Sequence, residues 1–171
     1  MIAPMNKAFV REPDEDVPDR LPELPLPPPP NPVTEAGLGQ IKTALEAVER
    51  RLADATARPE RAEAERLQRE ARYWAARLAT ARLTLPPVDA DIAGFGSHLT
   101  IAWPGRGEVG LSIVGNDEAD PKAGLIAWRA PVAAALVGHG TGERVVVQLA
   151  GREVELTILA VCNVPQPPEP A

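Results

Sequence analysis

The stretch from Ile113 to Gly138, "IVGNDEADPKAGLIAWRAPVAAALVG", contains the end of one apolar segment, an acidic loop, a second short apolar segment and a run of alanine and leucine. "GLIAW" begins at a turn residue and is typical of a short strand. Pro131 fits the first turn of a helix, and Gly138 fits the stop after its last turn. We therefore predict a strand, an acidic loop, a second strand and a small helix in this order.

The sequence on both sides of this stretch supplies further short strands separated by turn signals such as "PGRG", "GHGTG" and "AGRE". The predicted strands are "HLTIAW" (98–103), "GEVGLSIVG" (107–115), "GLIAW" (124–128), "ERVVVQL" (143–149) and "REVELTILAV" (152–161). Together with the small helix they predict an antiparallel sheet with one short helix packed on it, over residues 86–163. The proline-rich end, residues 164–171, is predicted to be a disordered tail.

Residues 1–32 contain half of the 20 prolines of the chain, with acidic residues between them. Proline removes a backbone donor and biases the preceding residue to an extended conformation. Neither helix nor sheet is expected there, and we predict a disordered, partly polyproline arm.

Residues 33–85 have the spacing of two helices. After a possible N-cap at Thr34, apolar residues recur at alternating steps of three and four, at Leu38, Ile41, Leu45, Val48 and Leu52. Pro59 breaks this pattern, and the same steps recur at Leu67, Ala71, Trp74, Leu78, Ala81 and Leu85. Two such seams joined by a short turn can cover each other only by folding back, which predicts an antiparallel coiled-coil hairpin and an α+β protein as a whole.

Composition excludes several classes of protein. The formal net charge of −6 argues against direct binding to a nucleic-acid backbone, so nucleic acid is expected only indirectly, through a protein partner. One cysteine and two histidines exclude an internal disulfide and a multi-cysteine zinc site. No apolar run approaches the roughly 18 residues of a membrane span. We expect a cytoplasmic monomer that contacts no membrane and holds no metal or cofactor.

The C-terminal order of motifs, with "IVGNDEAD", "LIAWRAPVAAALVG" and "GREVELTILAV", resembles the GreA/GreB family of bacterial transcription elongation factors. The resemblance covers residues 33–162 and is specific in the C-terminal part. It implies an FKBP-like sheet domain that docks on the rim of the secondary channel of RNA polymerase, while the hairpin enters the channel. It also implies that the protein has no catalysis of its own.

In cleavage-stimulating members of that family, acidic residues at the hairpin tip help hold a catalytic Mg²⁺ in the polymerase, so Mg²⁺ would be only an indirect cofactor here. Their tip motif, glycine-aspartate-leucine-serine-glutamate-asparagine, is replaced by "LADATARPERAEAE", residues 52–65. The candidate tip acids Asp54, Glu60 and Glu63 alternate with arginines, a pattern typical of surface ion pairs. This chain therefore also resembles the branch called regulator of nucleoside diphosphate kinase, which has a shorter hairpin without tip acids.

The acidic loop has two interpretations. Asp117, Glu118 and Asp120 lack the ligand spacing of a calcium loop, so one interpretation is a solvated turn in which Asn116 or Asp117 caps its own backbone. The other, implied by the resemblance, is a polymerase-docking surface. The predicted docking residues are Asn116, Asp117, Glu118, Asp120, Arg129 and Pro131.

Three alternatives remain open from the sequence. The first is a genuine cleavage-stimulating factor that uses the substitute tip acids. The second is a peptidyl-prolyl isomerase-like domain, although only Phe95, Trp103 and Trp128 could line its pocket. The third is direct nucleic-acid binding by the arginine-rich second helix, whose arginines are mixed with Glu. Trp74 and Trp128 are expected in the core, and Cys162 is expected to be a small buried apolar residue.

Overall fold

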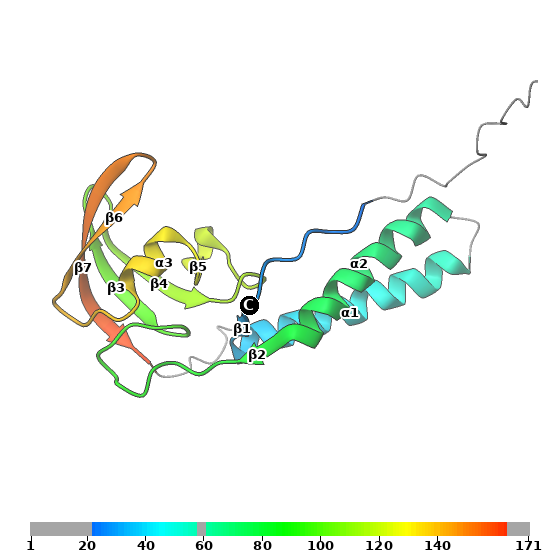
Figure 1. Cartoon of the computed structure of the whole chain (residues 1–171), viewed down its shortest axis with the longest axis horizontal. Coiled ribbons are helices and arrows are strands. Elements are labelled where there is room, and N and C mark those ends of the chain that lie inside the picture. The colour runs from blue at the N-terminus through cyan, green and yellow to red at the C-terminus, as the bar shows by residue number, and fades with distance from the viewer. Residues whose placement is uncertain (1–21, 58–60, 164–171) are drawn as a thin grey trace, which may run out of the picture.

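The computed structural model describes residues 22–57 and 61–163, and Figure 1 shows a helical hairpin on one side and a curled sheet on the other. The predicted α+β class is confirmed. The expected tail at 164–171, most of the expected arm, and the turn that contains Pro59 and Glu60 lie outside the described residues. None of the described helices is long and apolar enough to cross a membrane.

The hairpin consists of α1 (Glu35–Thr56) and α2 (Arg61–Thr80), which lie side by side in Figure 1. Thr34 is the N-cap of α1, because its Oγ1 accepts a hydrogen bond of 2.9 Å from the backbone N–H of Gly37. Val48, Ala55 and Leu67 are buried between the helices, with Leu52, Ala64, Ala71 and Trp74 packed against them. The middle of the predicted seam therefore forms the hairpin core, whereas Leu85, predicted as its last residue, lies beyond α2 and is exposed.

The second helix ends at Thr80, five residues before the predicted end at Leu85. Beyond it, β2 (Ala81–Leu83) pairs in parallel with β1 (Asn31–Val33). The Asn31 side chain donates a hydrogen bond of 3.0 Å to the carbonyl of Arg77, which satisfies one of the free carbonyls at the helix end. Tertiary pairing thus overrides the helical spacing, and the expectation that no sheet forms before Val33 is wrong at Asn31 and Pro32.

The main sheet has the strand order β5-β4-β3-β7-β6. The strands lie where the sequence predicts them, at β3 (His98–Trp103), β4 (Gly107–Val114), β5 (Leu125–Ala127), β6 (Arg144–Leu149) and β7 (Arg152–Cys162). All neighbours are antiparallel except β4 and β5, which are parallel, so the prediction of a wholly antiparallel sheet is wrong at this edge. The reason is the connection through the acidic loop and the short 3₁₀ helix η1 (Pro121–Ala123), which crosses back before β5 starts.

The core of the sheet domain lies between the sheet and α3 (Pro131–Leu136). Pro131 occupies the first turn of α3 as predicted, and Gly138 follows the helix with a positive φ of 85°. The fully buried residues are aliphatic and include Leu99, Ile101, Ile113, Leu136, Leu156 and Ile158. Trp128 packs against this core, whereas Cys162 at the end of β7 is only partly buried. The loop between β4 and β5 is held at both ends, because Ile113 of β4 lies in this core and Ile126 of β5 packs against it.

Candidate functional site at the joint between the hairpin and the sheet domain

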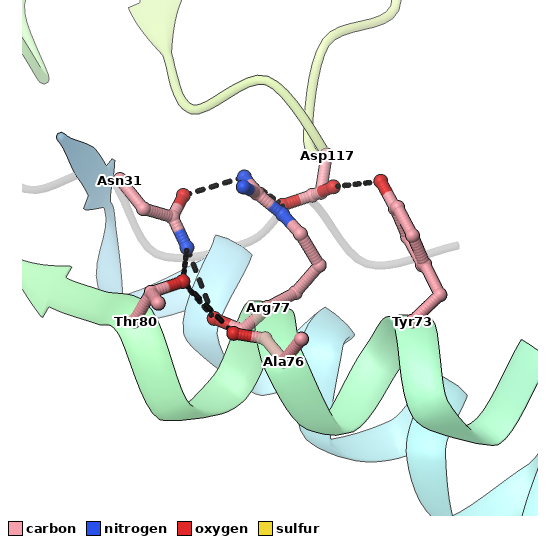
Figure 2. Close-up of polar contacts among 6 residues, drawn as sticks. All are labelled: Asn31, Tyr73, Ala76, Arg77, Thr80 and Asp117. Carbon is pink, nitrogen blue, oxygen red and sulfur yellow. Dashed lines mark hydrogen bonds and ion pairs between the residues drawn. The ribbon is translucent and has the colours of Figure 1, made fainter. Parts of the chain in front are cut away.

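The acidic loop after β4 reaches the hairpin through Asp117. Figure 2 shows the Asp117 carboxylate facing the Arg77 guanidinium of α2, with Nη2 at 2.7 Å and Nε at 2.8 Å from Oδ2. Both side chains are buried, with 2% of Arg77 and 8% of Asp117 exposed. Two charges out of water are tolerated only when they are paired and hydrogen-bonded, so this ion pair fixes the loop against the helix.

Two further side chains make hydrogen bonds to this ion pair in Figure 2. The hydroxyl of Tyr73 donates a hydrogen bond of 3.1 Å to the other oxygen of Asp117. Arg77 Nη2 also donates to Asn31 Oδ1 at 2.5 Å, so β1 joins the same network. Burial, and after it the neighbouring Asp117, raises the pKa of Tyr73, which keeps the phenol protonated and able to donate. The network ties the arm, the hairpin and the sheet domain together.

A second contact connects the acidic loop to the start of α1. The Thr34 hydroxyl donates a hydrogen bond of 2.6 Å to Glu118 Oε2 while it caps the helix. A carboxylate at this position also faces the positive end of the helix dipole. Gly37 gives the carboxylate room, since a Cβ there would lie 2.6 Å from Glu118 Oε2. The loop therefore docks on both helices of the hairpin.

The sequence interpretation of the loop changes in two respects. Asp117 and Glu118, predicted as docking residues, have side chains that bind the chain's own hairpin. The backbone capping expected of Asn116 or Asp117 is made instead by Asp120. Its side chain accepts a hydrogen bond of 3.0 Å from the backbone N–H of Lys122. Asn116 is partly buried in the same loop.

The predicted docking residues that remain exposed are Asp120, Arg129 and Pro131. The last two form the corner between β5 and α3. The Arg129 guanidinium lies 4.7 Å from the centre of the Trp128 ring, which is a cation–π contact. Its Nη2 also donates a hydrogen bond of 2.8 Å to the carbonyl of Pro29. This corner is the part of the predicted docking surface whose side chains can meet a partner.

The hairpin tip shows paired charges where it is described. Glu63 lies 2.6 Å from Arg66 and 3.2 Å from Arg51, and the hydrogen bond from Arg66 is the main reason that the pKa of Glu63 is lowered. Asp54 is exposed on α1, and Glu60 lies outside the described residues. Within the described ranges, no group of three or more His, Cys, Asp or Glu could hold a metal ion. Because its oxygens are already engaged by arginines, Glu63 is a poor candidate for holding Mg²⁺.

The fold and the joint define a two-part protein in which a sheet domain holds a helical hairpin in a fixed direction. The profile of the family described as "Transcription elongation factor, GreA/GreB, C-term" matches residues 88–163, which is the sheet domain with the linker before it. The sheet domain is thus similar to the C-terminal domain of the GreA/GreB transcription elongation factors, over a part of the chain that does not include the hairpin.

Several curated relatives of this chain are named transcription elongation factor GreA. The protein from Pasteurella multocida is 48% identical over 54 residues, which cover 32% of this chain and 34% of that protein. The protein from Pseudomonas aeruginosa is 41% identical over 71 residues, which cover 41% and 45% of the two chains. The chain thus spans about a third to a half of the length of the curated relatives it matches.

Two solved structures align with most of this chain at low TM-scores. GreA factor homolog 1 (Gfh1) of Thermus thermophilus aligns with a TM-score of 0.37 and 21% identity, over 77% of this chain and 97% of that one. The elongation factor GreA/GreB from Nitrosomonas europaea gives a TM-score of 0.39 and 20% identity, over 79% and 99%.

Proposed function

We propose that this protein is a regulator of transcription elongation that binds RNA polymerase through its sheet domain, at the rim of the secondary channel. The observation that carries this proposal is the family match over residues 88–163. Polymerase binding at the channel is what the family resemblance implies for a sheet domain with an attached hairpin. Contact with nucleic acid would then be indirect, through the polymerase.

The joint supports this role mechanically. A factor that docks through one domain can direct the other into a channel only when the angle between them is defined. The buried pair of Arg77 and Asp117 and the contact of Thr34 with Glu118 both link the acidic loop to the hairpin. Breaking a buried ion pair costs much more than breaking an exposed one, so these contacts hold the hairpin direction.

The tip supports binding without stimulation of transcript cleavage. A carboxylate that helps hold a second catalytic Mg²⁺ must have free oxygens that face the polymerase active site. Glu63 instead pairs with arginines of both helices. The protein would therefore occupy the channel without Glu63 as a metal ligand, and it would have no catalytic activity of its own.

The other candidate functions receive less support. Isomerase activity of an FKBP-like domain needs an open aromatic pocket, but Trp103 and Trp128 each have a guanidinium near the ring, at 5.0 and 4.7 Å. Direct nucleic-acid binding needs free arginines on α2, but Arg66, Arg72 and Arg77 are paired with Glu63, Glu23 and Asp117.

The corner between β5 and α3 provides the test of polymerase docking. The double variant Arg129→Glu, Pro131→Ala is expected to lower polymerase affinity by about tenfold, because it reverses the charge of the exposed side chain and changes the helix start beside it. Binding is measured by titration of labelled protein with purified RNA polymerase core enzyme. Arg152→Glu, an exposed charge reversal on β7, is the matched control and should bind as the unmodified chain does. Unchanged affinity of the double variant, together with a normal melting curve, would remove this corner from the docking surface.

A further inference from the structure

The proline-rich segment 22–30 lies beside α2 in an extended conformation, and Figure 1 shows it leaving β1 along the hairpin. Two arginines of α2 hold its outer end. Arg72 donates hydrogen bonds to the Glu23 carboxylate, the shortest of them 2.6 Å long. Arg69 Nη1 donates a hydrogen bond of 3.0 Å to the carbonyl of Pro22. The bond from Arg72 is the main reason that the pKa of Glu23 is lowered. The segment is therefore recognised by its charge and by a backbone carbonyl.

An apolar contact lies beside these polar ones. Leu24 lines a shallow hollow of about 260 Å³ on the face of α2, together with Arg66, Arg69, Glu70, Tyr73 and Trp74. Tyr73 and Trp74 meet edge to face, with ring centres 5.1 Å apart, which gives the hollow a rigid aromatic wall. An aromatic wall beside basic residues is the kind of surface that binds extended proline-rich peptides.

The inner end of the segment reaches the sheet domain. Arg129 Nη2 donates a hydrogen bond of 2.8 Å to the carbonyl of Pro29, from the corner between β5 and α3. The segment thus spans from α2 to the same Arg129 that the proposed function places on the polymerase-docking surface. While Pro29 occupies this guanidinium, that donor is not available to a partner.

The contacts of the segment are of a kind that can be exchanged. Prolines have no N–H, so the segment offers mainly carbonyl acceptors, and its polar contacts to Arg69, Arg72 and Arg129 are all exposed. The side chains of Arg72 and Glu23 are 52% and 63% exposed, which makes their ion pair sensitive to salt. A proline-rich segment is also extended before it binds, so it loses little conformational entropy when it docks.

We propose that the face of α2 around Arg69, Arg72 and Trp74, together with Arg129, is a binding groove for an acidic, proline-rich peptide, and that its occupant is the chain's own segment 22–30. In this role the segment is a displaceable cover over Arg129, and a partner that docks at the corner competes with it. The competition with polymerase rests on the proposed function, whereas the groove itself does not.

The groove is tested on the full chain by backbone NMR relaxation of Glu23, Leu24 and Leu26. We expect order parameters near those of rigid backbone, about 0.85, in the unmodified chain and below about 0.6 in Arg72→Glu. The charge-swapped double variant Arg72→Glu, Glu23→Arg should restore order, and Arg50→Glu on α1 is the control that should leave it unchanged. Low order parameters in the unmodified chain, or no change in Arg72→Glu, would overturn the groove.

Competition is tested separately with RNA polymerase. A segment that is docked about nine-tenths of the time lowers the affinity of the covered site about tenfold, so Arg72→Glu should bind polymerase up to about tenfold more tightly. The double swap should return the affinity to that of the unmodified chain. Equal affinity of all three proteins would overturn the role as a cover. Failure of every variant to bind polymerase would instead reject the proposed function, while the relaxation data would still decide on the groove.

Discussion

Replacement of Arg77 by methionine is expected to lower the free energy of unfolding by about 3–5 kcal/mol, the usual cost of removing one partner from a buried ion pair. The change leaves the carboxylate of Asp117 in a site where only 8% of its side chain is exposed. It also removes the donor to Asn31, which belongs to β1. Urea unfolding followed by circular dichroism measures the loss.

The control is the double variant Arg77→Met, Asp117→Asn, which removes both charges and keeps an acceptor for the Tyr73 hydroxyl. It should be more stable than Arg77→Met alone, because no unpaired charge remains buried. A single variant as stable as the unmodified chain would mean that Asp117 is solvated in solution and that the joint is open.

Substitution of Leu67 by alanine should cost about 2–5 kcal/mol, since it creates a cavity in a small core. Leu67 is 1% exposed and is one of three buried residues in the hairpin cluster, with Val48 and Ala55. The sheet domain has a core of its own, so the loss should appear as early melting of helical signal. Thermal unfolding monitored at 222 nm by circular dichroism detects it.

The matched control for this prediction is Leu67→Met, which nearly conserves volume and should cost less than about 1.5 kcal/mol. Equal melting of Leu67→Ala and Leu67→Met would show that the hairpin seam contributes little to stability. In that case the direction of the hairpin would depend on the joint alone.

Much of the fold could be predicted because it is encoded locally. Alternation and turn residues identify β3, β4, β6 and β7, and Pro131 with Gly138 delimits α3. The direction of β5 could not be predicted in this way, because it depends on how the acidic loop and η1 cross the edge of the sheet. The end of α2 at Thr80 likewise depends on Asn31, which is far away in sequence.

The joint shows the limit of sequence reasoning more clearly. Asp117 and Glu118 stand out as an acidic cluster, but nothing local indicates that their partners are Arg77 and Thr34. Arg77 is one of many arginines on α2, and its position one residue before the seam residue Leu78 does not distinguish it, because Arg66 lies in the same way before Leu67. Burial of an arginine is decided by tertiary contacts, so charge pattern alone suggested a solvent-facing loop.

The exposed corner was easier to predict than the joint. The family resemblance places docking residues at the corner between a strand and a helix, which here is Arg129 and Pro131. Both are exposed in the structure, and their role in docking stays a prediction. The contact of Arg129 with Pro29 could not be foreseen, since proline-rich sequence gives no sign of where its carbonyls lie.

The proposal that this protein binds RNA polymerase at the secondary channel and does not stimulate cleavage can be tested directly. The most direct measurement adds the purified protein to RNA polymerase stalled in a backtracked complex and follows transcript length, with and without a known cleavage factor. We predict no shortening by this protein alone and slower shortening by the added factor, because the channel is occupied. Shortening by this protein alone, or an undiminished rate with the added factor at saturating protein, would contradict the claim.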